Sequence, residues 1–245
     1  MKAVKASDPM VVLFVQAVQT GNLDELRRLL DEFPSLASMR AIDNKGCSRT
    51  ALHVVADWPG YFPNGPEVVK MLIDAGADPN APATGGTFAE TPLHWAASSD
   101  DADVAAALID SGADMEVLGG SIAGGSPLDN AVGYGCWNVA RLLVQRGAHV
   151  NKLWHAAALG MRSRVEELIG SDPAPSRNDI TEAFWQACSG GQRRVAEYLL
   201  SKGADINGSP DYTDQTPLDA AGGLDTRRDT LVTWLKSKGA ISAKE

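Results

Sequence analysis

Apolar residues recur every three or four positions along most of the chain, with polar residues between them. The pattern is seen in three separate stretches: Leu23, Leu26, Leu29 and Leu30; Val68, Met71 and Leu72; and Val139, Leu142 and Leu143. This spacing places apolar side chains on one face of a helix. The apolar run 10–18 precedes the first stretch, but Gln16 interrupts it and no small-residue cleavage site follows. The pattern therefore predicts a series of short amphipathic helices, of which the first is a terminal helix rather than an export signal.

A four-residue phrase recurs along the chain and predicts where helices begin. Its copies are Thr50-Ala-Leu-His53, Thr91-Pro-Leu-His94, Ser126-Pro-Leu-Asp129 and Thr216-Pro-Leu-Asp219. The oxygen of a Thr or Ser side chain can accept a hydrogen bond from a free N–H group at the start of a helix. Proline fits the next position, where no N–H donor is needed. Each phrase therefore predicts the start of an inner helix.

A second phrase follows each copy of the first and predicts where an outer helix ends. Its copies are Ala75-Gly-Ala-Asp-Pro-Asn80, Ser111-Gly-Ala-Asp-Met-Glu116, Arg146-Gly-Ala-His-Val-Asn151, Lys202-Gly-Ala-Asp-Ile-Asn207 and Lys238-Gly-Ala240. The glycine in each copy is expected to adopt the left-handed conformation that ends a helix. Counting back from these phrases locates two more copies, near Asn151 and Glu182, whose first phrase is lost. The repeats thus start near 12, 50, 91, 126, 151, 182 and 216.

The period of about 33 residues and the Thr-Pro-Leu-His phrase resemble the ankyrin repeat. The resemblance covers about residues 10–240. It implies an all-α fold, an ankyrin repeat solenoid of about seven helix-turn-helix repeats with N- and C-terminal caps. We expect the caps at 10–45 and 216–245. Because stacked repeats bury one another's apolar faces, residues 1–245 are expected to form a single ankyrin repeat domain.

Several stretches depart from a regular repeat. The insert 57–66 adds about five residues between two helices and contains aromatic and proline residues, which predicts a stiff apolar flap. The connections 81–90 and 117–125 are also long, whereas no hairpin fits between Val150 and Leu153. The insert and the run 90–101 are similar to stand-alone bacterial ankyrin repeat proteins. That resemblance implies a cytoplasmic protein and carries no activity.

Side chains expected on the concave side are unusually aromatic and polar, and two interpretations stay open. In the first, His53 and His94 join neighbouring turns by hydrogen bonds, while Trp154 and Trp185 fill gaps in the core. In the second, the insert folds toward the inner groove, bringing Trp58 against Trp95 over an aromatic-lined pocket. The ligand-binding residues of this second interpretation are Asp57, Trp58, Tyr61, Trp95, Ser98, Asn130, Tyr134, His155 and Gln186.

Composition narrows the classes of partner. The chain has 31 acidic and 22 Lys and Arg residues, a formal net charge of -9, which argues against nucleic acid because phosphates are bound by Lys and Arg. Cys47, Cys136 and Cys188 lack the spacing of a zinc site and form an odd set, which fits a reducing cytoplasm. We expect no metal, no cofactor and no membrane partner.

Two functions remain open. The ankyrin resemblance implies a binding module that recognises a protein partner through its concave face and hairpin loops, and the acidic charge favours a basic or apolar partner surface. The alternative is a small-molecule binding protein or enzyme with its pocket under the 57–66 insert. His155, Asp57 and Asp129 would then be the candidates for acid-base catalysis. The sequence does not decide between the two.

Overall fold

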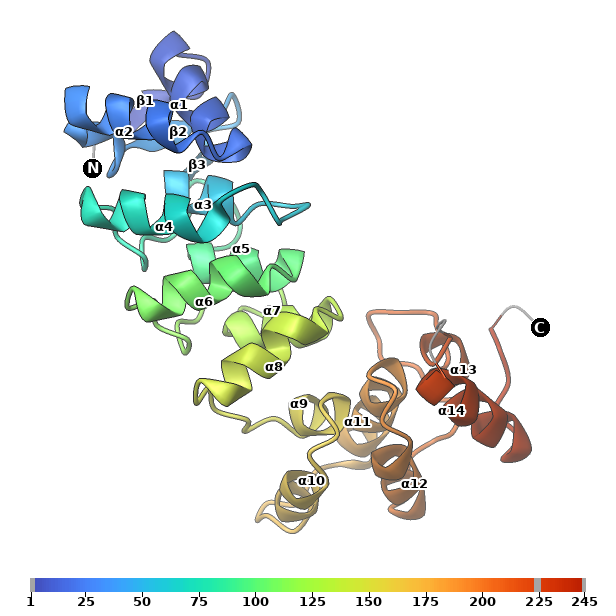
Figure 1. Cartoon of the computed structure of the whole chain (residues 1–245). Coiled ribbons are helices and arrows are strands. Elements are labelled where there is room, and N and C mark those ends of the chain that lie inside the picture. The colour runs from blue at the N-terminus through green and yellow to red at the C-terminus, as the bar shows by residue number, and fades with distance from the viewer. Residues whose placement is uncertain (1–2, 223–225, 244–245) are drawn as a thin grey trace. The chain divides into compact units, whose positions relative to one another are not determined.

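The computed structural model describes residues 3–222 and 226–243, which contain seven successive helix pairs (Figure 1). The chain forms two compact units, Met1–Ala148 and His149–Glu245. The pairs of the first unit are α1 (Pro9–Thr20) with α2 (Leu23–Glu32), α3 (Ala51–Val55) with α4 (Gly65–Asp74), α5 (Pro92–Ser99) with α6 (Ala102–Asp110), and α7 (Pro127–Gly133) with α8 (Trp137–Gln145). The pairs of the second unit are α9 (Leu153–Ala158) with α10 (Arg162–Ile169), α11 (Arg177–Ser189) with α12 (Arg193–Ser201), and α13 (Pro217–Ala220) with α14 (Thr226–Ser237).

Within each unit, successive pairs stack with inner helix on inner helix and outer helix on outer helix. In the first unit α3 contacts α5, α5 contacts α7, and the outer helices α4, α6 and α8 form a parallel row. In the second unit α11 lies between α9 and α13, and α12 lies between α10 and α14. The predicted all-α fold of about seven repeats is confirmed. The prediction of a single domain over 1–245 stays a prediction.

A small sheet belongs to the N-terminal end of the first unit. Strand β1 (Ala3–Lys5) pairs in parallel with β2 (Arg40–Ile42), which pairs antiparallel with β3 (Ser48–Arg49). A short 3-10 helix, η1 (Pro34–Leu36), lies between α2 and β2. In β3, the hydroxyl group of Ser48 lies 2.6 Å from that of Thr84. This contact ties the first hairpin to the next connection.

Most of the apolar residues predicted to face inward are buried in the core, whereas Leu23, Met71 and Leu142 are half-buried. On the outer helices of the first unit, Val68, Leu72, Val139 and Leu143 are fully buried. The glycines of the second phrase all have a positive φ, between 89° and 100°, at Gly76, Gly112, Gly147, Gly203 and Gly239. Their left-handed conformation ends each outer helix as the sequence predicts.

The fourth residue of each first phrase closes the start of its inner helix. In α5, Nδ1 of His94 accepts a hydrogen bond from the backbone N–H of Thr91 at 3.1 Å and lies 2.9 Å from its hydroxyl. In α7, the Asp129 carboxylate accepts from the N–H and the hydroxyl of Ser126, at 2.8 and 3.0 Å. Helix starts are thus satisfied internally, whether the fourth residue is His or Asp.

The other ring nitrogen of each histidine joins one repeat to the next. Nε2 of His53 donates to the carbonyl of Glu90 at 3.0 Å, and Nε2 of His94 donates to the carbonyl of Gly125 at 3.1 Å. Glu90 and Gly125 immediately precede the Thr or Ser of the following copy. Because Nδ1 accepts and Nε2 donates, both rings are neutral. The prediction that these histidines hold neighbouring turns together is confirmed.

The sixth repeat differs from the prediction at its start. Its inner helix α11 begins at Arg177, five residues before the expected start near Glu182. Ser176 and Asp179 form the capping pair, with the Asp179 carboxylate accepting from the Ser176 N–H at 2.8 Å. The sequence places this helix start too far along the chain, because the residues that correspond to the first phrase lie about one turn inside the helix. This capping pair lies outside the recurring register.

The carboxylate of Asp219 holds the C-terminal cap in place by hydrogen bonds. The two oxygens of Asp219 accept from the N–H and hydroxyl of Thr216, the hydroxyl of Ser242 and the N–H of Ala243, at 2.6 to 3.0 Å. These hydrogen bonds hold the pKa of the Asp219 carboxyl well below its usual range. The segment that follows α14 is therefore fixed against the start of α13.

Candidate functional site

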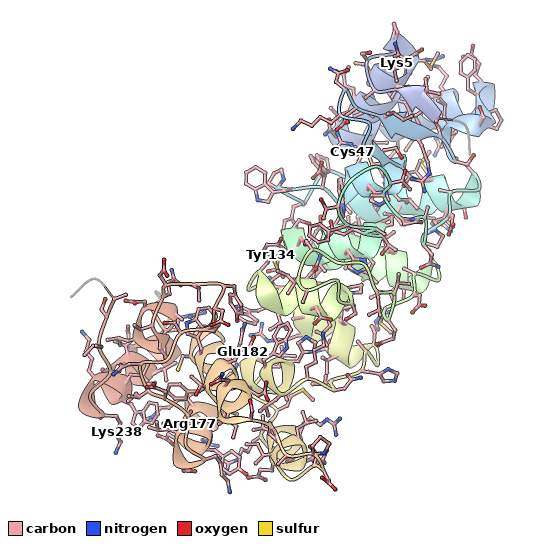
Figure 2. The ribbon with its side chains drawn as sticks, turned by 180° about the vertical axis from the view of Figure 1, so that it is seen from behind. Lys5, Cys47, Tyr134, Arg177, Glu182 and Lys238 are labelled. Atoms are coloured by element: carbon pink, nitrogen blue, oxygen red, sulfur yellow. The ribbon has the colours of Figure 1, made fainter. Side chains whose placement is uncertain are left out.

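The inner-helix side of the first unit carries a cavity of about 250 Å³. Its walls come from the α3–α4 insert, from α5, from the α6–α7 loop and from Tyr134 at the end of α7, which Figure 2 labels. The lining residues are Asp57, Trp58, Glu90, Trp95, Ser98, Ser99, Ser121 and Tyr134. The insert therefore brings Trp58 and Trp95 to one cavity, which is the placement expected from the sequence. That these residues bind a ligand stays a prediction.

A second cavity of about 290 Å³ shares Glu90 and Trp95 with the first. Its remaining walls come from Ala6, from the β2–β3 hairpin, which contains Cys47 (Figure 2), and from the long connection 83–88. Phe88 and Arg49 lie in this lining. We call the two cavities together the Trp95 groove.

The insert is anchored at its middle, away from the cavity. The backbone N–H of Tyr61 donates to the Asp101 carboxylate at 2.5 Å, and its hydroxyl donates to the carbonyl of Asp100 at 2.6 Å. The amide of Asn64 donates to the carbonyl of Gly21 at 2.9 Å. Tyr61 is absent from the cavity lining. It holds the insert over the α5–α6 turn, which leaves Trp58 free to cover the cavity.

Glu90 is held in place by groups from the following repeat. Its Oε1 accepts from the N–H of Ser121 and from the side-chain amide of Asn130, both at 2.8 Å. Asn130 is fully buried and also donates to the hydroxyl of Ser98 at 3.2 Å. Asn130 thus lies behind the cavity, where it orients Glu90 and does not itself line the wall.

Arg49 and Asp57 form an ion pair beside Trp95. Nη1 of Arg49 lies 3.0 Å from Oδ2 of Asp57, and its guanidinium carbon is 5.9 Å from the centre of the Trp95 ring. Partial burial raises the pKa of Asp57, whereas the charge of Arg49 and the N–H of Trp58 oppose the rise. The rings of Trp95 and His53 pack in a T-shaped arrangement at a centroid distance of 5.0 Å, and the indole nitrogen of Trp95 is buried without a hydrogen-bond partner.

The histidines beside the groove are poor proton carriers near neutral pH. Burial lowers the pKa of His53 to about 4, because the charged ring would lose its hydration. Burial also lowers the pKa of His94, although the carbonyl of Gly125 opposes the shift. Both rings are already committed to joining repeats, so they are structural groups.

The remaining candidates from the sequence have other surroundings. Asp129 caps α7 and is buried. His155 and Gln186 lie buried in the second unit, where the His155 ring meets Trp154 at a centroid distance of 4.1 Å. The amide of Gln186 donates to the hydroxyl of Tyr212 at 3.0 Å. Of the three acid-base candidates, Asp57 is the one that lines the cavity.

Three residues of the first cavity, Glu90, Ser99 and Ser121, are absent from the ligand-binding residues predicted from the sequence. Glu90 has a position that could have drawn attention, since it directly precedes Thr91 in the repeat phrase. Its role depends on partners 31 and 40 positions further along the chain. Ser121 lies in a glycine-rich loop whose path no local pattern indicates, so neither Glu90 nor Ser121 could be assigned from the sequence.

Two features are absent from the part of the chain that the structure describes. Residues 3–222 and 226–243 contain no group of three or more His, Cys, Asp or Glu side chains arranged to hold a metal ion. Over the same residues, none of the helices has the length and apolar character needed to cross a membrane.

Comparison with known proteins identifies the repeat. A family model described as ankyrin repeats, in three copies, matches residues 62–152. Comparison with curated protein sequences finds no match. The solved ankyrin repeat domain of Bcl-3, a member of the IkappaB family, is 25% identical and aligns over 90% of this chain and 97% of its own, with a TM-score of 0.52.

The human ASB11 ankyrin repeat domain is 18% identical over 92% of this chain and 97% of its own, with a TM-score of 0.53, and supports the fold alone. The repeated phrases, the seven helix pairs, the family model and these structures agree. Residues 62–152 therefore contain ankyrin repeats, and the fold over most of the chain is similar to that of solved ankyrin repeat domains.

Proposed function

We propose that the chain is a protein-binding ankyrin module that recognises its partner through the Trp95 groove. The supporting observation is that large aromatic side chains stand exposed around the groove: Trp58 is 79%, Tyr134 54% and Phe88 44% exposed. Apolar patches of this kind mark interaction sites, because exposed aromatic surface is unfavourable unless it is covered. Trp and Tyr also supply much of the binding energy at protein interfaces.

The groove supports a small-molecule site or an enzyme less well. Each of the two cavities alone, at about 250 and 290 Å³, is smaller than the typical pocket for a drug-sized ligand, which begins at roughly 300 Å³. The lining of the groove contains no histidine. Asp57 is engaged by Arg49. A protein segment lying along both cavities uses the exposed aromatics without requiring an acid-base pair.

The net charge and the free thiols support a class of partner and a compartment. A formal net charge of -9 favours a basic or apolar protein surface over nucleic acid. Cys47, Cys136 and Cys188 are free. Burial raises the pKa of the Cys136 thiol to about 11, which keeps it protonated. Unpaired thiols support the expectation of a reducing compartment such as the cytoplasm. The bacterial origin suggested by the sequence stays a prediction.

The test is selection of peptides from a displayed random library on the full chain. Selected peptides should bind wild type and a Tyr212→Ala control, whose exposed tyrosine lies in the second unit, with similar affinity. The double variant Trp58→Ala/Tyr134→Ala should lose at least about tenfold in affinity, since each change removes an exposed aromatic anchor. Peptides that bind the double variant as well as wild type would place the binding surface outside the groove.

A further inference from the structure

Glu90 is a partly buried carboxylate without a counter-charge. Within the described residues it makes no ion pair, and its two hydrogen bonds from Ser121 and Asn130 both end on Oε1. Partial burial of an unpaired charge is costly, because protein atoms replace hydrating water. The fully buried Asn130 nevertheless fixes the carboxylate in the cavity wall. A fixed, unpaired anion of this kind is suited to a cation from outside the chain.

The cavity around Glu90 suits a cation in its other walls too. The lining combines two carboxylates, Asp57 and Glu90, with the aromatic rings of Trp58, Trp95 and Tyr134, and it contains no basic side chain. Aromatic faces attract cations within about 6 Å of the ring centre. Arg49, on the other side of the groove, already illustrates this preference, with its guanidinium carbon 5.9 Å from the centre of Trp95.

We propose that this cavity receives a lysine or arginine side chain of the protein partner. The ammonium or guanidinium group would meet Glu90, while the aliphatic stem would lie against the aromatic walls. This inference rests on the proposed function and adds the chemistry of the partner. Charge complementarity selects the occupant: the linings of the whole groove hold three carboxylates, Asp43, Asp57 and Glu90, against one guanidinium, that of Arg49.

An apolar anchor is the competing occupant, and the Glu90 side chain separates the two. Burying the carboxylate under an apolar group would leave it without water and without a counter-ion. A basic side chain replaces the lost water with a charge-assisted hydrogen bond. Preference for lysine over a neutral side chain of equal length is therefore the signature of the proposal.

The probes are four synthetic tridecapeptide libraries with a fixed central residue, which is lysine, arginine, norleucine or glutamate, in an otherwise random sequence. Binding to the full chain is measured by fluorescence anisotropy. For wild type we expect the lysine or arginine library to bind about tenfold more tightly than the norleucine library, a typical effect of a buried charge-assisted contact. Comparison of the two basic libraries distinguishes an ammonium from a guanidinium site.

Glu90→Gln is the decisive variant, because the amide oxygen can still accept from Ser121 and Asn130. It should remove the preference for basic libraries and leave the thermal midpoint unchanged. Glu67→Gln is the matched control, since it removes the same charge from a residue that is exposed on the outer helix α4. Its binding should equal that of wild type.

Three results would overturn the inference, and they separate it from the proposed function. Equal binding of the lysine and norleucine libraries by wild type, or an unchanged preference in Glu90→Gln, would exclude a cation site. If binding still fell in Trp58→Ala/Tyr134→Ala, the groove would remain a protein-binding surface with an apolar occupant. Failure of every library to bind wild type would contradict both proposals.

Discussion

In both units, a side chain near the start of an inner helix forms a hydrogen bond that joins one repeat to the next, but the side chains differ. In the first unit, the imidazoles of His53 and His94 donate to the carbonyl that precedes the next repeat, at 3.0 and 3.1 Å. Trp185 occupies the corresponding position of α11 in the second unit. Its indole N–H donates to the carbonyl of Gln215, directly before Thr216, at 2.7 Å. At His53, His94 and Trp185 a ring N–H therefore joins two repeats, and either kind of ring supplies it. Where the same position is Asp129 or Asp219, the carboxylate closes the helix start without such a donor.

The next position along the helix shows where the units diverge. Trp95 follows His94 and lines the groove of the first unit. Gln186 follows Trp185 and is buried, with its amide donating to Tyr212. The position of His94 and Trp185 therefore serves to join repeats in both units, whereas the position that follows it differs between the units. In the first unit that neighbour serves the candidate site.

The largest expected effect comes from removing the last repeat. Leu218, Leu231 and Leu235 pack in one core with Phe184 and Leu199, so deletion of residues 216–245 should expose the apolar face of the sixth repeat. We expect aggregation, measured by size-exclusion chromatography with light scattering. A monomeric truncated chain with an unchanged urea midpoint would show that residues 216–245 do not cap the second unit.

Trp185→Ala should be the most damaging single substitution. It deletes a side chain that is only 8% exposed and leaves the carbonyl of Gln215 without its donor. The expected loss of unfolding free energy is about 3 kcal/mol, measured by urea denaturation. Trp95→Ala, at a partly exposed position, should cost clearly less while weakening peptide binding. Equal destabilisation by the two changes would erase the distinction between the positions.

Acid should destabilise the histidine-joined first unit in particular. The pKa of His53 falls from its ordinary value of 6.5 to about 4 on folding, so below pH 6.5 the unfolded chain takes up a proton that the folded chain refuses. Stability is therefore complete above pH 7 and decreases as the pH falls toward 4. The contribution of His53 to the free energy of unfolding should fall by about 2 kcal/mol between pH 7 and pH 5.

Urea titrations at several pH values would measure this loss. Because asparagine does not titrate in this range, His53→Asn/His94→Asn should reduce the pH dependence of the unfolding free energy, even if the variant is less stable at every pH. A double variant that keeps the wild-type slope would assign the acid sensitivity to other groups.

The smallest expected effect concerns the start of a single helix. Thr91→Ala removes the hydroxyl that contacts Nδ1 of His94 and should cost about 1 kcal/mol of unfolding free energy. Thr91→Ser retains the hydroxyl and serves as the control. If both variants unfold at the wild-type midpoint, the Thr91 side chain does not stabilise the start of α5.

Local chemistry made most of the fold predictable. Helix starts at Thr91 and Ser126, and the left-handed glycines that end the outer helices, depend on groups within a few positions of each other. The start of α11 at Arg177 was missed because Ser176 and Asp179 form a second, non-recurring cap. The boundary between the compact units, after Ala148, falls beside the missing hairpin that the sequence does indicate.

The candidate site was only half predictable. The exposed Trp58 and the neighbouring Trp95 stand out because aromatic residues are unusual in an insert and on an inner face. Glu90 does not, since its orientation is set by Ser121 and Asn130 across the repeat boundary. The sequence predicts that Asn130 binds the ligand, whereas in the structure Asn130 orients Glu90 and does not line the cavity.

Hydrogen–deuterium exchange with a bound peptide tests the central claim most directly, that the first unit binds through the Trp95 groove while the equivalent positions of the second unit serve structure. The probe is the tightest-binding single peptide selected from the displayed random library. We expect added protection in segments 57–61, 86–99 and 119–134, and none in 177–189 or 209–216. Protection confined to the second unit, with exchange in the groove unchanged, would contradict the account.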